Sequence, residues 1–424
     1  MFDEGISFRH EFAHIVSTLT RILGPRHLSL AEEVAQDALI KAMQTWPHDG
    51  VPSNPSAWLI QVAKNRAIDA IRRDQRFGPQ SAQSEHISFA GVAAFGFHPE
   101  TTLRGEPAVP DDDELLMMFL VCHPVLPREA RVALTLKTVC GFGVGEIARA
   151  LLSREEAVAQ RLVRAKRQLR DADVRFAIEP AEYPERLESV LDAIYLLFNE
   201  GYAAHGGEDL VREELCGEAI RLVTLVADSS IATPAVHALL ALLCLQAARL
   251  PARVGAAKEL LRLSDQDRSQ WDGPLLAAGF RALDRASAGD AMTIYHLEAG
   301  IAACHAAALS FDQTDWRRIV ELYDLLVRLK PTPIVALNRA IAVAKLEGPR
   351  AGLAALQPIA DDPMLARYYL LHAAMGELTW QAGDPAHAAD DFRSALACDC
   401  SEPERRFLER RLTTLSAEIA EHAE

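Results

Sequence analysis

A cationic amphipathic segment at residues 154–170 most constrains what this chain can fold into. Its apolar residues recur at helical spacing and form one stripe, made of Val158, Leu162, Ala165 and Leu169. Between residues 161 and 170 the segment has five basic residues and no acid. Upstream come an expected helix from residue 128, a glycine-rich break, a short helix at 144–151 and a tight turn. This order is typical of a helix-turn-helix.

Local signals agree with that interpretation. Ser153 and Glu156 form an S-x-x-E pattern, which predicts a capping box at the start of the basic helix. Ile147, Ala148 and Leu151 of the short helix can pack on the apolar stripe. A helix that is apolar on one side and cationic elsewhere suits the major groove of DNA. The alternative is a solvated basic face, because such charge patterns are common.

The charge of the chain is distributed unevenly. The 424 residues allow two to four domains and carry a net charge of −15. Residues 1–176 contain 21 basic and 22 acidic side chains, which leaves −14 for the remainder. A protein of this kind is expected to bind DNA poorly alone and better when a larger partner contributes affinity.

Composition also limits the compartment. No uninterrupted apolar run approaches the roughly 18 residues that span a bilayer. Residues 1–12 are acidic and aromatic, so we do not expect a secretion signal. The seven scattered cysteines indicate reduced thiols, and we expect a cytoplasmic protein without a membrane partner. The C-x-C at 398–400 lacks a second pair and is weak evidence for a metal.

The amino-terminal part is expected to contain three helices, at 6–23, 29–46 and 56–76. Ser29 is placed to cap the second, and Trp46-Pro47 to end it. Residues 78–110 are rich in Gly, Pro and Ser and lack helical periodicity, which predicts a flexible linker. The helix-turn-helix follows within 111–176, and Pro180 and Pro184 mark a further boundary.

From residue 183 onward the sequence indicates almost only helix. Gly383 lies 35 residues after Gly348, which lies 33 after Asp315. Around Gly383, the positions of Gly376, Ala388, Phe392 and Ala395 match the spacing of the tetratricopeptide (TPR) repeat. An irregular helical bundle without true repeats is the alternative. Either arrangement is a scaffold for partners rather than for chemistry.

These parts resemble a known family in their order. Residues 35–42 (AQDALIKA), followed by residues 55–73 (PSAWLIQVAKNRAIDAIRR), look like region 2 of extracytoplasmic-function sigma factors, and residues 128–170 look like their region 4. The phrases at 122–127, 159–166 and 195–202 are closest to a subgroup with a long TPR-like carboxyl-terminal extension. One departure is residues 151–153, where an aromatic residue would be expected. The resemblance implies an all-α protein divided into region 2 (1–77), a linker (78–110), region 4 (111–176) and the extension (183–424).

The resemblance also implies functions for residues of region 2. The helix around Asp37 and Lys41 would dock on the clamp helices of the largest polymerase subunit. Asn65 would contact an unstacked base of the melted minus-ten element, since its amide offers donors and acceptors. Single-stranded DNA would be held by the cations Lys64, Arg66, Arg72, Arg73 and Arg76.

Structural alternatives remain open for several of these residues. Asp37 and Lys41 could be a solvent-facing ion pair one helical turn apart, worth only tenths of a kcal/mol. Asn65 and Asp69 could serve hydrogen bonding within or between helices. We expect Trp58 to belong to the core rather than to form a stacking platform.

In region 4, the residues expected to reach bases of the minus-thirty-five element are Arg154, Gln160, Arg161 and Arg164. An arginine at a guanine edge or a glutamine at adenine supplies roughly 1–3 kcal/mol of discrimination. Lys137 and Lys166 are expected on phosphates.

Two motifs are interpreted as coincidental. His10-Glu11-Phe12-Ala13-His14 matches the H-E-x-x-H pattern of zinc proteases, with Glu32 or Glu33 as an imaginable third ligand. Only nine residues precede it, so there is no room for a substrate-binding sheet. The glycines at 141–145 follow no strand, so a phosphate-binding loop is not expected. We therefore expect no catalytic residue, no metal and no cofactor.

Two functional classes follow. The first is a sigma factor that directs RNA polymerase core to promoter DNA through minus-ten and minus-thirty-five elements, with an extension that regulates activity or binds a protein partner. The second is an ordinary helix-turn-helix regulator with TPR-like interaction repeats. The segment at 31–76 favours the first class, because a repressor or activator does not need a second basic helix preceded by a docking helix.

Overall fold

The structure is a computed structural model that describes residues 8–77, 113–151, 153–174, 176, 180–202, 213–255 and 261–421. The expected linker at 78–110 lies outside the described residues. Within the described part, regular structure is helical apart from isolated bridge residues, of which Tyr368 and Asp399 pair with each other. The all-α prediction is therefore confirmed. The chain forms two compact units, Met1–Leu197 with Asp228–Ile231, and Phe198–Ala227 with Ala232–Glu424.

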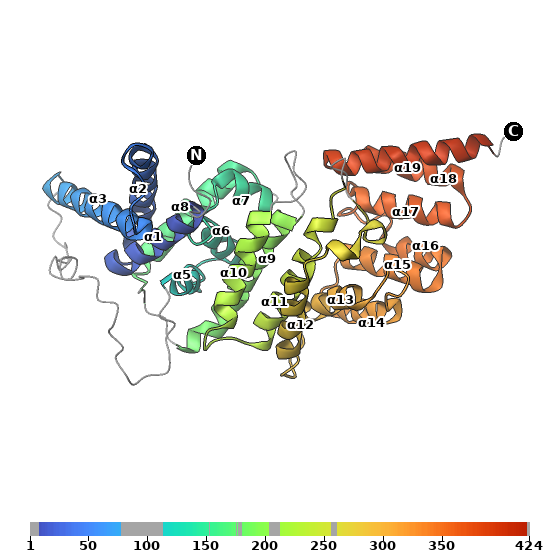
Figure 1. Ribbon diagram of the computed structural model, residues 1–424, viewed down its shortest axis with the longest axis horizontal. Coiled ribbons are helices and arrows are strands. Elements are labelled where there is room, and N and C mark those ends of the chain that lie inside the picture. Colours follow the sequence, from blue (N-terminus) through green and yellow to red (C-terminus); the bar gives the residue numbers. More distant parts are fainter. Residues whose placement is uncertain are drawn as a thin grey trace. The chain divides into compact units, whose positions relative to one another are not determined.

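The helices of the first unit can be followed in Figure 1. They are α1 (Phe8–Leu23), the 3-10 turn η1 (Pro25–His27), α2 (Leu28–Asp49), α3 (Pro55–Phe77), α5 (Asp113–Val121), α6 (Arg128–Thr138), α7 (Val144–Ala150), α8 (Glu155–Asp171), η2 (Pro180–Glu182) and α9 (Tyr183–Tyr202). The last turn of α9 belongs to the second unit.

Helices α1, α2 and α3 pack around one apolar core. Trp46 is 3% exposed, and its ring centroid lies 5.5 Å from that of Trp58, which is partly buried as expected for a core residue. Asn54 begins α3 by accepting a hydrogen bond from the backbone N–H of Ala57 at 3.0 Å. The buried stripe of α3 recurs at helical spacing, as Leu59, Ala63, Ala67 and Ile71.

Two expected boundaries of α2 were wrong. The helix begins at Leu28 directly after η1, so Ser29 is an exposed residue inside the helix rather than its cap. It also continues through Pro47 to Asp49. Pro47 has no backbone N–H, so it cannot donate the helical hydrogen bond to the carbonyl of Met43, four residues earlier. Met43 itself is 54% exposed. Water can satisfy that carbonyl, so the proline is tolerated in the last turn.

Helices α6, α7 and α8 form the expected helix-turn-helix. Val158, Leu162, Ala165 and Leu169 are all buried, which confirms the apolar stripe. The expected capping box was wrong: the residue that precedes α8 is Arg154, and no side chain caps the helix. The backbone N–H of Ser153 instead donates to the carbonyl of Ala148 at 2.8 Å, so Ser153 belongs to the turn after α7.

Region 4 packs directly on region 2 in the first unit. Helix α1 contacts α5 and α6, and η1 contacts α8. Gly141 permits part of this approach. It has a φ of +68°, and a Cβ there would lie 2.8 Å from Cγ of Arg9 and 3.2 Å from the Arg9 carbonyl. A side chain at this position would meet both backbone strain and a clash.

Helix α9 is part of the region 4 core, although it was expected to begin the extension. Arg186 is 2% exposed and donates to the carbonyl of Phe119 at 3.2 Å and to Glu182 at 2.8 Å. The ring of Tyr183 meets that of Phe119 edge-on, with centroids 5.1 Å apart. Arg131 of α6 pairs with Glu185 at 3.7 Å. The first helix after region 4 therefore shares its core.

The second unit is built from antiparallel helix pairs (Figure 1). Its helices are α10 (Glu213–Ala227), α11 (Pro234–Ala247), α12 (Gly273–Ala286), α13 (Ile294–Ala307), α14 (Trp316–Leu329), α15 (Pro333–Glu347), α16 (Pro349–Leu356), α17 (Tyr369–Gln381), α18 (Pro385–Leu396) and α19 (Glu402–Glu421). Short 3-10 turns lie at Leu250–Ala252, Leu263–Asp265, Arg268–Gln270 and Gln357–Ile359.

The most apolar helix of this unit belongs to its core. The stretch Pro234–Ala252 is long and apolar enough to cross a membrane, by length and composition alone. Within the described residues 67% of its hydrophobic window is buried inside the protein, where α11 packs on α12 and α13. A core helix of this kind passes the same test.

Glycines separate the helices of the last pairs. Gly348 and Gly383 adopt φ values of +98° and +94° between α15 and α16 and between α17 and α18. Gly376 brings α17 close to α18, since a Cβ there would lie 3.2 Å from the ring of Phe392. These are the positions from which the repeat was inferred. Whether the pairs are TPR repeats stays a prediction.

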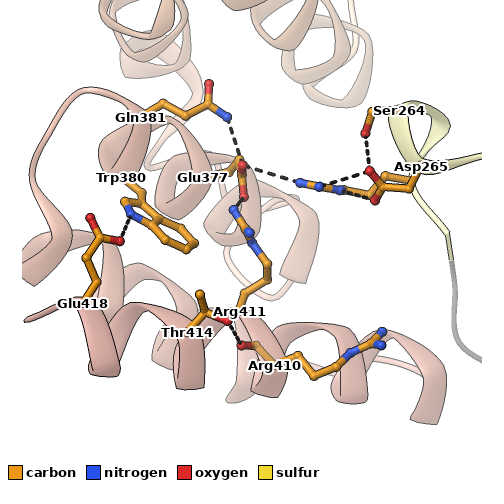
Figure 2. Close-up of polar contacts among 10 residues, drawn as sticks. Ser264, Asp265, Glu377, Trp380, Gln381, Arg410, Arg411, Thr414 and Glu418 are labelled. Carbon is orange, nitrogen blue, oxygen red and sulfur yellow. Dashed lines mark hydrogen bonds and ion pairs between the residues drawn. The ribbon is translucent and has the colours of Figure 1, made fainter.

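Polar contacts tie α17 to α19 (Figure 2). The carboxylate of Glu377 on α17 pairs with Arg411 of α19. The indole N–H of Trp380 donates to Glu418 at 2.8 Å, and the guanidinium of Arg411 lies 4.2 Å from the Trp380 ring centroid. Together with the apolar cluster around Phe392, Leu408 and Leu415, these contacts close the end of the unit.

Candidate nucleic-acid interface

The exposed face of α3 carries the residues expected to hold single-stranded DNA. Opposite the buried stripe, Asn65, Arg66, Arg72 and Arg73 are exposed, while Lys64 is half-buried. Arg76 lies in the last turn of α3, but its side chain is outside the described residues. The exposed face is therefore mainly cationic, and the exposed Asp69 adds one acidic group to it.

Asn65 is accessible but already makes one intrahelical hydrogen bond. Its Oδ1 accepts from Nε2 of Gln61 at 2.9 Å, one turn earlier on α3. This bond orients the amide so that its Nδ2 donor points away from Gln61. The structure thus contains the intrahelical bond considered as the alternative, and it leaves the exposed amide able to meet a base.

Asp37 and Lys41 do not form the ion pair considered from the sequence. Asp37 of α2 pairs with Arg66 of α3, and the two side chains remain 41% and 46% exposed. Lys41 is exposed one turn later. The Asp37–Arg66 pair therefore joins a residue expected at the polymerase to a residue expected at DNA. An exposed pair of this type contributes little to stability, so it can exchange for other partners.

The first turns of α8 present the residues expected to read bases. Arg154, Gln160 and Arg164 are exposed, and Arg161 is half-buried. Arg164 donates to Oε1 of Gln160 at 3.2 Å across one turn. A hollow of about 400 Å³ runs beside these side chains, between α8 and the start of α6, where Pro127 and Glu129 form the opposite wall. Glu155 and Glu156 occupy the first turn, where they interact favourably with the helix dipole.

The two lysines expected on phosphates face region 2 instead. Lys166 of α8 pairs with Glu32 of α2, whose side chain is only 9% exposed. The ammonium of Lys137 on α6 lies 5.9 Å from the ring centroid of Phe12 on α1. Their contacts with DNA stay a prediction, and in this arrangement both lysines are engaged within the protein.

Arg9 is a contact residue that the sequence reasoning missed. Its guanidinium pairs with Glu146 of α7 at 3.2 Å and lies 4.9 Å from the ring centroid of Phe142. Glu146 also accepts from the backbone N–H of Gly143 at 2.8 Å. No local pattern distinguishes Arg9, because its partners are more than 130 residues away in sequence.

Glu11, the glutamate of the H-E-x-x-H match, makes a contact between two helices. Oε1 of Glu11 accepts from the hydroxyl of Ser56 at 2.6 Å, which joins α1 to the start of α3. His10 and His14 are partly buried on α1. The described residues thus assign Glu11 to helix packing.

Family models match three segments of the chain. Sigma-70 region 2 matches residues 8–77, sigma-70 region 4 matches residues 116–169, and a family of unknown function, DUF6596, matches residues 186–287. No solved structure matches the chain significantly.

Three similar proteins come from two species. An uncharacterized protein of Rhizobium meliloti (strain 1021) is 39% identical over 403 residues, which cover 94% of this chain and 93% of its own length. In two strains of Mycobacterium tuberculosis, the probable ECF RNA polymerase sigma factor SigI is 24% identical over 179 residues, 42% of this chain. That match spans 58% of the mycobacterial protein, whereas the rhizobial match includes the extension.

A region 2 module followed by a region 4 helix-turn-helix defines a transcription initiation factor of the sigma-70 class. The chain belongs to the extracytoplasmic-function (ECF) group of the sigma-70 family, with a long carboxyl-terminal helical extension. Sigma factor families are not enzymes, and their domains imply RNA polymerase core and promoter DNA as partners.

Proposed function

We propose that this sigma factor contacts the minus-ten element through the exposed face of α3 and the minus-thirty-five element through the first turns of α8. The observation that carries the proposal is that Asn65 and Gln160 are both exposed although region 2 and region 4 pack together. Polymerase core would dock at α2 through Asp37 and Lys41. We further propose that the protein acts in the cytoplasm, without catalytic activity of its own.

In this proposal, Lys137 and Lys166 contact DNA only after a rearrangement of the first unit. They would reach phosphates only after region 4 separates from α1 and α2, because their ammonium groups now contact Phe12 and Glu32. Binding to polymerase core would supply the free energy for this separation. The acidic chain would then bind promoters well only as part of the holoenzyme.

The extension is proposed to support region 4 and to regulate it or bind a partner. Support for the first part comes from α9, whose Arg186 and Tyr183 pack on Phe119 of α5. A chain cut after residue 180 would lose these contacts, so loss of activity would not reveal regulation. A chain that ends after residue 202 keeps α9 and tests regulation separately.

The proposal is tested first by co-purification of the full chain with RNA polymerase core, followed by transcription from supercoiled promoter DNA. We expect the protein to bind core and to redirect it to new start sites. Binding to the same DNA with equal affinity in the absence of core would indicate an ordinary helix-turn-helix regulator.

Base reading is tested by Gln160→Ala on promoters that vary in the minus-thirty-five element. We expect discrimination at one base pair to fall by about 1–3 kcal/mol, while other positions are unaffected. Gln168→Ala is the matched control, because Gln168 is an exposed glutamine two turns further along α8. Equal effects of the two substitutions would contradict the assignment of Gln160.

A further inference from the structure

A cavity of about 630 Å³ lies within the second unit. Its walls come from α14, α15, α17 and α19, together with the turn at residues 262–264. This volume lies within the range of small-molecule binding sites, which is roughly 300–1,000 Å³. Its residues are separate from those expected to contact DNA or polymerase.

The wall of the cavity is mainly apolar and aromatic. Phe311, Trp316, Tyr323, Tyr369 and Phe407 all line it. Aromatic side chains provide a large apolar surface with little conformational freedom, which suits binding of a flat or hydrocarbon body. Burial raises the pKa of Tyr323 to about 12, so this wall carries no phenolate at neutral pH.

Arg262 and Glu377 at one end of the cavity neutralise each other. Arg262 pairs with Asp265 at 2.8 Å and with Glu377 at 3.5 Å. Glu377 also pairs with Arg411 and accepts from Nε2 of Gln381 at 2.9 Å (Figure 2). Two of these partners are guanidinium groups, which offset the charge of Glu377 and disfavour its pairing with a cationic ligand.

Glu404, the second carboxylate that lines the cavity, also accepts hydrogen bonds from neighbouring groups. Glu404 accepts from the hydroxyl of Tyr369 and from the backbone N–H and hydroxyl of Ser401, the latter two at 2.7 Å. His305 adds no charge at neutral pH. Its pKa is lowered to about 4 by burial and, to a smaller extent, by the charges of Arg249 and Arg268.

Lys345 and Glu404 are the charged lining residues without an ionic partner among the described residues, and of these two only Lys345 also has no hydrogen-bond partner there. Its ammonium lies 5.6 Å from the ring centroid of Phe311, at an exposed position on α15. Asn338 lines the same cavity two turns earlier on α15 and is also exposed. The cavity therefore combines an aromatic wall, an ammonium and an amide that have no hydrogen-bond partner among the described residues, and the carboxylate of Glu404, which is held by its three hydrogen bonds.

We propose that this cavity binds a small amphipathic carboxylate, whose apolar body packs on the aromatic wall and whose carboxylate pairs with Lys345. Asn338 donates a second hydrogen bond to the ligand. The proposal goes beyond the sigma-factor function, because it assigns the extension a small-molecule site that can sense a metabolite. A neutral or cationic ligand of the same shape lacks the interaction with Lys345.

Three probes of equal size test the charge preference: 2-naphthylacetate, 2-naphthylacetamide and 2-(2-naphthyl)ethylamine. Binding to the full-length protein is measured by calorimetry at low salt. We expect the carboxylate to bind at least about tenfold more tightly than the amide, and the amine to bind most weakly. Equal affinities, tighter binding of the amine, or no binding of any probe at about 1 mM would overturn the proposal.

Variants locate the site. Lys345→Gln should abolish the preference for the acid over the amide while leaving amide binding unchanged. Lys330→Gln is the matched control, since Lys330 pairs with Glu298 and does not line the cavity. Ala373→Trp should block all probes by filling the space, provided that circular dichroism and the melting temperature show a folded protein. Retained preference in Lys345→Gln would overturn the proposal. The assay needs neither polymerase nor promoter, so its failure is distinct from failure of the sigma-factor assignment.

Discussion

Arg186 holds a positive charge in an environment that ordinarily excludes charge. Burial lowers the pKa of this guanidinium, and the nearby carboxylate of Glu182 opposes the shift. The side chain satisfies the carbonyl of Phe119 at the end of α5, where helical acceptors lack partners. A hydrocarbon side chain at this position would leave that carbonyl without its donor.

We expect Arg186→Met to lower the free energy of unfolding of region 4 by about 2–4 kcal/mol, because a buried acceptor loses a charged donor. Arg128→Met is the control. Arg128 also reaches α9, through Glu188 and Asp192, but it is 58% exposed, so we expect a loss below about 1 kcal/mol. Calorimetric melting of both variants measures the two losses of unfolding free energy. Equal losses would show that burial of Arg186 is not the cause.

His305 should make the second unit sensitive to acid. Its folded pKa of about 4 lies below the ordinary value of 6.5, because burial and two arginines disfavour the imidazolium. The unfolded chain therefore binds a proton first, and stability falls as the pH drops from 6.5 toward 4, by about 3 kcal/mol in total. His305→Phe keeps an aromatic ring against Trp316 and should flatten the dependence of melting temperature on pH in this window. The exposed His48→Phe should leave it unchanged.

Individual residues can be assigned from the sequence where a local pattern, such as helical periodicity, marks them. The stripe of α8 and the exposed polar face of α3 follow from helical periodicity alone. Arg9, Arg186 and the partner of Lys166 could not be found in this way, because their contacts join segments distant in sequence. A charged side chain looks the same in sequence whether it meets solvent, DNA or another helix.

Among the helices, close approach sets narrow limits on side-chain size. Gly352 of α16 faces α15 and α17, and a Cβ there would lie 2.4 Å from Cβ of Ala344 and 2.9 Å from Cδ1 of Leu378. The clash with Ala344 involves a side chain that cannot rotate away. Helices α15 and α16 would have to separate to admit even one methyl group.

We therefore expect Gly352→Ala to destabilise the second unit by about 1–3 kcal/mol despite the higher helix propensity of alanine. Gly217→Ala in α10 should instead stabilise by about 0.5–1 kcal/mol, since Gly217 is exposed and its added Cβ would meet no atom within 4 Å beyond its chain neighbours and the backbone of its own helix. Differential scanning calorimetry of both variants tests the opposite signs. A stabilised Gly352→Ala protein would mean that the helices can separate at no cost.

Helix existence was readily predicted from the sequence, whereas helix ends were less predictable. Pro47 and Ser153 are ordinary boundary signals, yet α2 runs past the first and α8 begins one residue after the position that the second implied. In both places the surroundings differ from what the local signal implies: Pro47 lies in the last turn, four residues after the exposed Met43, and the turn after α7 engages the backbone of Ser153. The cavity beside Lys345 was not predictable, because it depends on the spacing between helix pairs.

For the first unit, the arrangement of region 2 and region 4 controls which cations are available. The expected DNA contacts separate into two groups. Asn65, Gln160 and Arg164 are exposed, whereas Lys166 and Lys137 contact α2 and α1. Free protein should consequently bind promoter DNA with fewer phosphate contacts than the holoenzyme.

Glu32→Gln tests this, because it removes the charge that holds Lys166. We expect the free protein to bind a minus-thirty-five duplex several-fold more tightly at low salt, with a salt dependence that is steeper by about one phosphate contact. Fluorescence anisotropy across a salt series measures both quantities.

The neighbouring Glu33→Gln is the control for total charge, since Glu33 is exposed and directly follows Glu32 in α2. If both substitutions raise affinity equally, net charge explains the effect and Lys166 is not released. A lower melting temperature without a change in DNA affinity would assign Lys166 to structure alone.

The sharing of α9 has a consequence for protein engineering. An exchange of carboxyl-terminal extensions between relatives would naturally be designed with the junction at the prolines near residue 180. That junction would remove the native α9, whose Arg186 and Tyr183 contact Phe119, and region 4 would have to pack on a helix from another protein. Chimeras joined after Tyr202 keep the native α9 together with the region 4 on which it packs, and we expect these chimeras to function.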